Sequence, residues 1–186
     1  FIHGHNIKKV TFHENIEYID QEAFSDCDNL ELANDKLPNY LKSIGYDAFQ
    51  NCKKSPKIGI PSSVVNIGSG AFRNCSGLKQ CIFAEDIQID NISSSMFYGS
   101  ENLEKITIPS DVTTIEASAF FSCKSLEKIY IPASVTTIGA SAFGGCSNIG
   151  EIEFEKESKL TTIESEAFSN CAITSIRIPA GVTKVG

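Results

Sequence analysis

Long apolar runs and clusters of basic residues are both missing from this 186-residue chain. No stretch approaches the roughly 18 apolar residues that a membrane-spanning helix needs, so membrane insertion is not expected. The formal charge of -7 and a pI near 5.0 argue against nucleic-acid binding, because neutralising phosphates requires clustered Lys and Arg. With 41% hydrophobic and 21% charged residues, the composition is ordinary for a folded protein.

Signatures of catalysis and metal binding are equally scarce. The seven cysteines include no C-x-x-C pair, so the usual spacing of zinc ligands is missing. No pair of carboxylates stands out by spacing, and no Ser, His and Asp constellation stands apart from the general pattern. His3, His5 and His13 would make a metal site only if the chain doubled back, and a frayed first unit is the simpler interpretation. We therefore expect no enzyme activity, no cofactor and no metal ion in these residues.

The most regular feature of the chain is a repeat of 23 to 25 residues, marked by a small residue or Met followed by Phe. An isoleucine lies five residues before every such Phe, and Ile, Leu or Val lies eight before it. A cysteine lies three residues after it in six of the seven units, and Ser100 takes this position once. The marker residues are Phe24, Phe49, Phe72, Phe97, Phe120, Phe143 and Phe168. Self-similarity of this length indicates a repeat architecture.

A short segment with alternating apolar residues joins one unit to the next. It is clearest in residues 103–109, Leu-Glu-Lys-Ile-Thr-Ile-Pro, and in residues 126–132, Leu-Glu-Lys-Ile-Tyr-Ile-Pro. Variants occur at residues 78–83, 149–154 and 173–178. Alternation with a period of two predicts strands with one buried face.

A unit of this length cannot bury its own apolar residues, but stacked units join equal positions into continuous rows. The alternating segments are expected to pair in register as one curved parallel sheet of about eight strands, about 35 to 40 Å long. The Val-Thr-Thr-Ile stretches predict a second short strand. The Ser-Ala-Phe-x-x-Cys segments are too short for a stable α-helix and should form one α or 3₁₀ turn. Between Cys27 and Leu41, an apparent insertion at Leu37 and Pro38 predicts a distorted turn.

Segment 103–123 reads L-x-x-I-x-I-P-x-x-V-T-x-I-x-x-x-A-F-x-x-C and closely resembles the BspA-like class of leucine-rich repeats. Segment 126–146 repeats it almost letter for letter, and the resemblance covers essentially the whole chain. It implies an α/β repeat fold, namely a right-handed solenoid with a parallel β-sheet on its concave face and short strands and single helical turns on its convex side. It also implies a non-catalytic surface protein of bacteria or protozoa, associated with adhesion to host or matrix proteins.

The repeat organises residues 1–186 into one array of seven units of 23 to 25 residues and a truncated eighth. The cysteine-rich end caps of vertebrate extracellular repeat proteins are missing, and the last unit stops before its Phe. The first residues contain neither a basic n-region nor an apolar h-region, so any secretion signal would lie outside them. We therefore expect a piece of a longer array.

The cysteines are expected to be buried free thiols that pack as small hydrophobic residues. Six of the seven share one repeat position, where stacked side chains point the same way and are badly placed for bridging. Cys81, which replaces a strand isoleucine, should be buried as well. Asn74 and Asn91 fit the N-glycosylation pattern, which often arises by chance.

A binding surface is expected at the strand positions that the repeat leaves free to vary. One outward column contains Thr11, Gly59, Ile82, Thr107, Tyr130, Glu153 and Arg177, and the column before it contains Lys9, Lys57, Lys105, Lys128 and Glu151. The lysines are either a solvated face or a basic stripe that would speed association with an acidic partner. The candidate contact residues are Ile82, Thr107, Tyr130, Glu153, Arg177, Lys105 and Lys128, with Tyr130, Glu153 and Arg177 as the first choice.

Three functions fit this pattern. The family resemblance favours an adhesion or recognition module at the cell surface or secreted, which binds host or matrix proteins through the concave strand face. Free cysteines suit a reducing compartment and favour an intracellular scaffold instead. The third possibility is a passive spacer that presents another domain. A signal peptide upstream would separate the first two functions.

Overall fold

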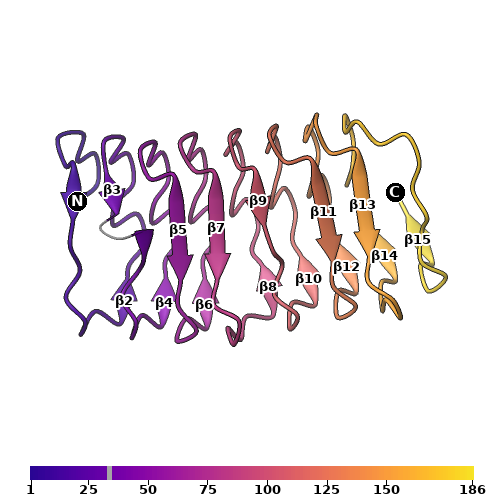
Figure 1. Cartoon of the computed structure of the whole chain (residues 1–186), viewed down its shortest axis with the longest axis horizontal. Coiled ribbons are helices and arrows are strands. Elements are labelled where there is room, and N and C mark those ends of the chain that lie inside the picture. The colour runs from indigo at the N-terminus through magenta and orange to yellow at the C-terminus, as the bar shows by residue number, and fades with distance from the viewer. Residues whose placement is uncertain (33–34) are drawn as a thin grey trace.

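The computed structural model describes residues 1–32 and 35–186, which form a row of stacked turns with the termini at opposite ends (Figure 1). Successive strands alternate between two rows as far as β14. The first strand row contains β1 (Lys9–Val10), β3 (Glu31–Leu32), β5 (Lys57–Ile60), β7 (Gln80–Phe83), β9 (Lys105–Ile106), β11 (Lys128–Ile131) and β13 (Glu151–Phe154). The second strand row contains β2 (Tyr18–Ile19), β4 (Ser43–Ile44), β6 (Asn66–Ile67), β8 (Asn91–Ile92), β10 (Thr114–Ile115), β12 (Thr137–Ile138), β14 (Thr162–Ile163) and β15 (Lys184–Val185).

All strand pairings among these elements are parallel, which confirms the expected solenoid with two strands in a unit. The first row is divided into the hydrogen-bonded groups β1-β3, β5-β7-β9 and β11-β13, rather than forming one continuous sheet. Segment 173–178, expected as a further strand of this row, forms none. Pro179 lies eight positions after Cys171, whereas in the unit of Cys123 the corresponding Pro132 lies nine positions after the cysteine. The shorter connection cannot keep both ends of the segment in register with β13.

The segments around the repeat phenylalanines are successive turns, so the expected α or 3₁₀ turn is wrong. In every unit the residues two before and two after Phe have positive φ, as Ser118 (56°) and Ser122 (59°) do around Phe120. Left-handed residues four apart cannot belong to a right-handed helix. No α-helix occurs in residues 1–32 and 35–186, nor any helix there long and apolar enough to cross a membrane. The α/β class is therefore corrected to a β-solenoid.

The positive φ values direct alternate N–H groups toward the next unit. The N–H of Phe120 donates to the carbonyl of Ala142 at 2.7 Å, whereas the N–H of Phe121 donates to Ser118 in its own turn at 3.0 Å. A helical turn would satisfy only bonds within the unit. The observed turns satisfy the buried backbone and also add a third row of bonds between units, beside the two strand rows.

A stack of phenylalanine rings runs along the core. Neighbouring ring centroids are 5.0 to 5.7 Å apart and their planes are within 6 to 14° of parallel. All seven marker phenylalanines belong to the stack, and Phe1 continues it beyond Phe24 at 5.4 Å. Pairs in this geometry contribute about 0.5–1.5 kcal/mol beyond the burial of their apolar area. The stack therefore ties each unit to both of its neighbours.

The cysteines confirm the expectation of free, buried thiols, except that Cys171 is only half-buried. At the repeat position each Sγ donates to the Phe carbonyl of the preceding unit, as Cys146 does to Phe120 at 3.0 Å. Ser100 keeps the pattern, because its Oγ donates to the carbonyl of Phe72 at 2.8 Å. The position therefore selects a small hydrogen-bond donor rather than a thiol as such.

The irregular unit between Cys27 and Leu41 reaches the first strand row twice. β3 ends at Leu32, and Lys36 then pairs with Gly59 in a separate parallel bridge. The next residue, Leu37, donates its N–H to the carbonyl of Gly59 at 3.1 Å. Residues 33–34, inside the expected distorted turn, lie outside the described residues. The insertion thus adds Lys36 to the outward column beside Gly59.

Candidate functional site

The outward side chains of the first strand row form one surface, here called the strand face. Alternation decides which residues belong to it: in β11, Ile129 and Ile131 are buried, whereas Lys128 and Tyr130 are exposed. Parallel register aligns the outward positions within each hydrogen-bonded group, and the repeat continues them from group to group as two columns. The columns are Lys57, Gln80, Lys105, Lys128 and Glu151, and Lys36, Gly59, Ile82, Thr107, Tyr130 and Glu153.

Six of the seven expected contact residues lie on the strand face and are exposed: Ile82, Thr107, Tyr130, Glu153, Lys105 and Lys128. Ile82 is 37% exposed and Tyr130 is 46% exposed, so both side chains offer apolar surface to a partner, as does Tyr18 of the second strand row at 61%. Arg177 is exposed too, but it belongs to segment 173–178, so the expected strand position for it is wrong. The structure therefore brings the other six together and leaves Arg177 beside them on an irregular segment.

Four lysines form ion pairs among the described residues, and the lysines of the strand face are among those that do not. Lys42, Lys79 and Lys124 each lie 2.8 to 3.2 Å from a glutamate of an adjacent unit. Lys105 and Lys128, like Lys57, have no such ion pair with any residue of ranges 1–32 and 35–186. Lys105 and Lys128 bring positive charge to this column on a chain whose net charge is -7, and Glu104, Glu127 and Glu151 line a hollow beside the same two lysines.

A hollow of about 440 Å³ opens over Gly59, where the outward column has no side chain. We call it the Gly59 hollow. Its lining consists of Lys36, Leu37, Asn39, Gly59, Ile60, Pro61, Ser62, Ile82 and Ala84. Sequence reasoning missed it, because the insertion hides the pairing of Lys36 with Gly59. The available signal was a glycine at an outward position of a strand, which often marks a close approach.

A second hollow, of about 420 Å³, lies further along the same face and is called the lysine hollow. Lys105, Lys128 and Gln80 provide its polar lining, together with Glu104, and Ile82 lines it as well as the Gly59 hollow. The strand face therefore has an apolar depression and a basic depression that meet at one exposed isoleucine.

Tyr130 lies where the basic part of the strand face meets an acidic part. Desolvation and the nearby carboxylates of Glu155 and Glu153 raise the pKa of its phenol above the usual value. A phenol is protonated at neutral pH even without this shift, so the hydroxyl can donate a hydrogen bond. The carboxylate of Glu155 also accepts the N–H of Ala133 at 2.7 Å, which holds it in place beside the ring.

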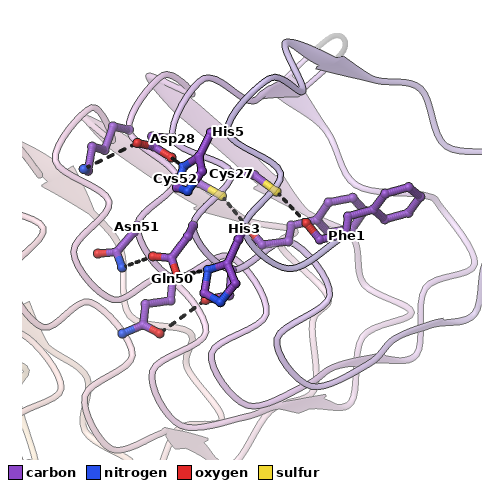
Figure 2. Close-up of polar contacts among 12 residues, drawn as sticks. Phe1, His3, His5, Cys27, Asp28, Gln50, Asn51 and Cys52 are labelled. Carbon is purple, nitrogen blue, oxygen red and sulfur yellow. Dashed lines mark hydrogen bonds and ion pairs between the residues drawn. The ribbon is translucent and has the colours of Figure 1, made fainter.

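Figure 2 shows a separate polar group formed by the first units of the array. Nδ1 of His3 lies 2.8 Å from a carboxylate oxygen of Asp26, and Nδ1 of His5 lies 2.6 Å from one of Asp28. The hydrogen bond with His5 is the main cause that lowers the pKa of Asp28. The N–H of His3 also donates to the carbonyl of Ser25 at 2.9 Å, so the first unit is joined to the second and the expected fraying is wrong here.

The rings of His3 and His5 stack with their centroids 6.3 Å apart. Nδ1 of His13 accepts the N–H of Asn15 at 3.3 Å. In the part of the chain that the structure describes, no three His, Cys, Asp or Glu side chains gather in a way that could hold a metal ion. The histidines are instead engaged with carboxylates and backbone.

The comparisons with known proteins agree with this architecture. A family model described as BspA type leucine rich repeat region, in six copies, matches residues 1–126 and 86–186. The structure of a leucine rich cell surface protein from Faecalibacterium prausnitzii A2-165 is 29% identical with a TM-score of 0.65, over 80% of this chain and 48% of that chain. The T. pallidum leucine rich repeat protein is 26% identical with a TM-score of 0.70, over 79% and 69%.

A leucine-rich repeat protein from Bacteroides ovatus ATCC 8483 shares the fold at 23% identity and a TM-score of 0.69, over 82% of this chain and 48% of that chain. The chain thus spans about half the length of the Faecalibacterium and Bacteroides proteins. No curated protein matches it. The two family matches overlap and together cover every residue, and the repeat spacing and parallel strand rows agree with them: the chain belongs to the BspA-type leucine-rich repeat family.

Proposed function

We propose that this chain is a non-catalytic protein-binding module that recognises its partner through the strand face. The observation that carries the proposal is a contrast between two kinds of position. Core positions repeat the same residue types in every unit, whereas Ile82, Tyr130 and Glu153 occupy equal outward positions of different strands. A rigid row of strands that holds such different side chains loses little conformational freedom on binding.

Tyr130 and Ile82 are the expected anchors of the contact. Exposed aromatic and aliphatic side chains on a rigid surface carry much of the affinity in protein interfaces, and Tyr is among the residues most enriched there. Lys105 and Lys128 would act mainly on the rate of association with an acidic surface, because exposed charges steer encounters more than they tighten complexes.

We further propose a cell-surface or secreted location and adhesion to host or matrix proteins. The support is the 29% identical Faecalibacterium prausnitzii relative, which is described as a leucine rich cell surface protein. An intracellular scaffold is the second candidate, because seven free cysteines suit a reducing compartment. Free thiols argue against an oxidising location such as the cell surface. Six of these thiols are buried, however, which reduces their exposure to oxidants and weakens this argument.

The test is binding of the immobilised chain to a panel of purified matrix and plasma proteins. The variant Tyr130→Ala with Lys105→Ala removes one ring and one charge from the strand face. The matched control, Tyr18→Ala with Lys184→Ala, removes the same groups from exposed positions of the second strand row. We expect saturable binding that the first variant weakens by at least about tenfold and the control leaves unchanged.

Two outcomes contradict the proposal. Equal binding by the strand-face variant and the control would show that the partner uses another surface. If the chain binds none of the proteins of the panel, the adhesion role is contradicted and the intracellular scaffold is favoured. Both variants change exposed side chains only, so their unfolding midpoints should match that of the unmodified chain within experimental error.

A further inference from the structure

The strand face has a fixed order of chemistry along the array, and this order restricts the kind of partner it fits. The Gly59 hollow lies over β5, Ile82 follows on β7, and Lys105 and Lys128 follow on β9 and β11. On the next strand, Glu151 and Glu153 reverse the charge. A partner therefore meets an apolar depression first, two lysines next, and then carboxylates that repel acidic groups.

The Gly59 hollow is suited to a single apolar side chain. Leu37 and Ile60, both buried, lie below it, and Pro61 and Ala84 add apolar surface. Ile82 stands beside it with 37% of its surface exposed, so an inserted side chain would also cover this residue. Filling such a depression removes apolar area from water on both partners, which is the usual source of affinity at a small contact.

The lysine hollow is suited to carboxylates. Lys105 and Lys128 are both exposed and lack an ion-pair partner among the described residues. Glu104 also lines this hollow, but its carboxylate lies 3.2 Å from Lys79 and is partly neutralised there. A carboxylate between the two lysines would gain an attraction to both, while Glu127 and Glu151, which line a neighbouring hollow with these lysines, limit the favourable region on the far side.

The distance between the two hollows predicts how far apart the matching residues lie in the sequence of the partner. Adjacent strands lie about 4.8 Å apart, so β9 and β11 are about 10 and about 14 Å from β5 along the array. An extended peptide advances about 3.3 Å for each residue. Side chains of an extended segment alternate between its two faces, so residues two and four positions from the apolar one point to the same side as it does, about 7 and about 13 Å along the array.

We infer that the strand face binds an extended protein segment in which one large apolar residue is followed or preceded, two and four residues away, by two acidic residues. This inference rests on the proposed function and adds the chemistry of the partner. The apolar side chain enters the Gly59 hollow and the two carboxylates face Lys105 and Lys128.

The experiment titrates residues 1–186 with blocked synthetic nonapeptides of Ser and Gly that carry one Phe and two Glu. In the motif peptides the Glu pair lies two and four positions after Phe, or two and four before it. In the spacing control the Glu pair lies one and three positions after Phe, so that both point away from the strand face, and in the charge control both Glu are replaced by Lys. Binding is read from the NMR shift of the Ile82 δ1 methyl group and from calorimetry.

We expect one motif peptide to bind at least about tenfold more tightly than either control. Lys105→Glu with Lys128→Glu should abolish this preference and favour the Lys peptide instead. Gly59→Val should weaken the motif peptide at least about fivefold by filling the hollow; an added Cβ there lies 3.2 Å from the carbonyl oxygen of Asp35 and 3.3 Å from Cγ of Lys36, so only a small shift is needed. Should Gly59→Val lower the unfolding midpoint, Ile82→Asn tests the same wall without a backbone contact.

Equal binding of the motif and spacing peptides overturns the inference, as does unchanged binding by the Lys105 and Lys128 double variant. A chain that binds a protein of the panel through the strand face but no motif peptide refutes this inference alone. A chain that binds neither refutes the proposed function as well.

Discussion

The Sγ of Cys123 donates a hydrogen bond to the carbonyl oxygen of Phe97, which lies 26 residues earlier, at 3.3 Å. Both groups are buried, so the bond joins two units inside the core. Cys52, Cys75, Cys146 and Cys171 make the corresponding bond. A thiol is a weak donor, and the hydroxyl of Ser100 takes the same place in one unit.

Replacing this donor predicts a graded loss of stability. Cys123→Ala removes the bond and leaves a small void, so we expect a loss of about 1–2 kcal/mol. Cys123→Ser should cost less, because Ser100 shows that a hydroxyl fits the position and bonds to the preceding Phe carbonyl at 2.8 Å. Urea unfolding midpoints measure both changes, and a Ser variant no more stable than the Ala variant would contradict the interpretation.

The thiols should react slowly and in a definite order. Burial raises the pKa of Cys75 to about 12 and that of Cys171 to about 11. Thiolate is therefore scarce at pH 8, and Cys171 is also the one half-buried thiol among the seven. We expect iodoacetamide to label Cys171 first in the native chain, as read by peptide mass spectrometry. All seven should react in concentrated urea, and labelling of Cys75 as fast as Cys171 in the native state would refute this order.

The raised thiol pKa values also predict alkaline destabilisation. An unfolded thiol loses its proton near pH 8.5, at about the ordinary pKa of cysteine. The native chain keeps these protons to higher pH, so it binds more protons than the unfolded chain, and stability falls as pH rises from about 9 toward 12. Unfolding midpoints should decline over this range, and Cys75→Ser should reduce the slope. An identical slope in that variant would assign the effect to other groups.

The ring stack predicts a difference between its middle and its end. Phe120 is completely buried between Phe97 and Phe143, at 5.4 and 5.0 Å. Phe120→Ala should therefore cost about 3–5 kcal/mol. Phe168 is half-buried and stacks on one ring only among the described residues, so Phe168→Ala should cost clearly less. Similar midpoints for the two variants in urea would contradict the packing role of the stack.

Gly70 is required by a contact as well as by its backbone angle. Its φ is +68°, and a Cβ there would lie 1.9 Å from Oδ1 of Asp47, a buried oxygen without a hydrogen-bond partner in the described residues. Gly70→Ala should destabilise the chain by more than the roughly 1 kcal/mol of backbone strain. Asp47→Ala should recover part of the loss, which a double-mutant cycle measures.

A matched glycine provides the control for this prediction. Gly145 also has a positive φ, of 72°, but its nearest neighbour is Oγ of Ser122 at 3.1 Å. Gly145→Ser should therefore cost about 1 kcal/mol or less, since Ser122 occupies the equal position of the preceding unit. If the losses of stability from Gly70→Ala and Asp47→Ala simply add in the double variant, the new Cβ does not clash with Asp47 and the prediction is wrong.

The repeat positions could be predicted because each is a local pattern. Alternating apolar residues in 126–132 predict a strand whose inner residues are Ile129 and Ile131, and both are buried. The shared cysteine position predicts burial, and Cys123 is inaccessible to solvent. Outward positions such as Tyr130 follow from the same alternation. Much of the candidate surface could therefore be predicted from residue spacing alone.

The turn around Phe120 and the place of Lys36 could not be predicted in this way. The Ser-Ala-Phe-x-x-Cys pattern fits a single helical turn as well as two tight turns, and the choice depends on bonds to the next unit, such as the one from Phe120 to Ala142. The pairing of Lys36 with Gly59 depends on the conformation of an insertion that has no counterpart in the other units. The Gly59 hollow follows from that pairing.

The sequence by itself determined the repeat, the family, the buried residues and the outward columns, because side-chain alternation and repeat spacing are properties of one unit. The tertiary structure alone decided the turn conformation, the irregular course of Arg177 and the two hollows that meet at Ile82. These features arise from hydrogen bonds and packing between residues of different units. Their energies depend on register across about 23 to 25 residues of chain, which no local pattern encodes.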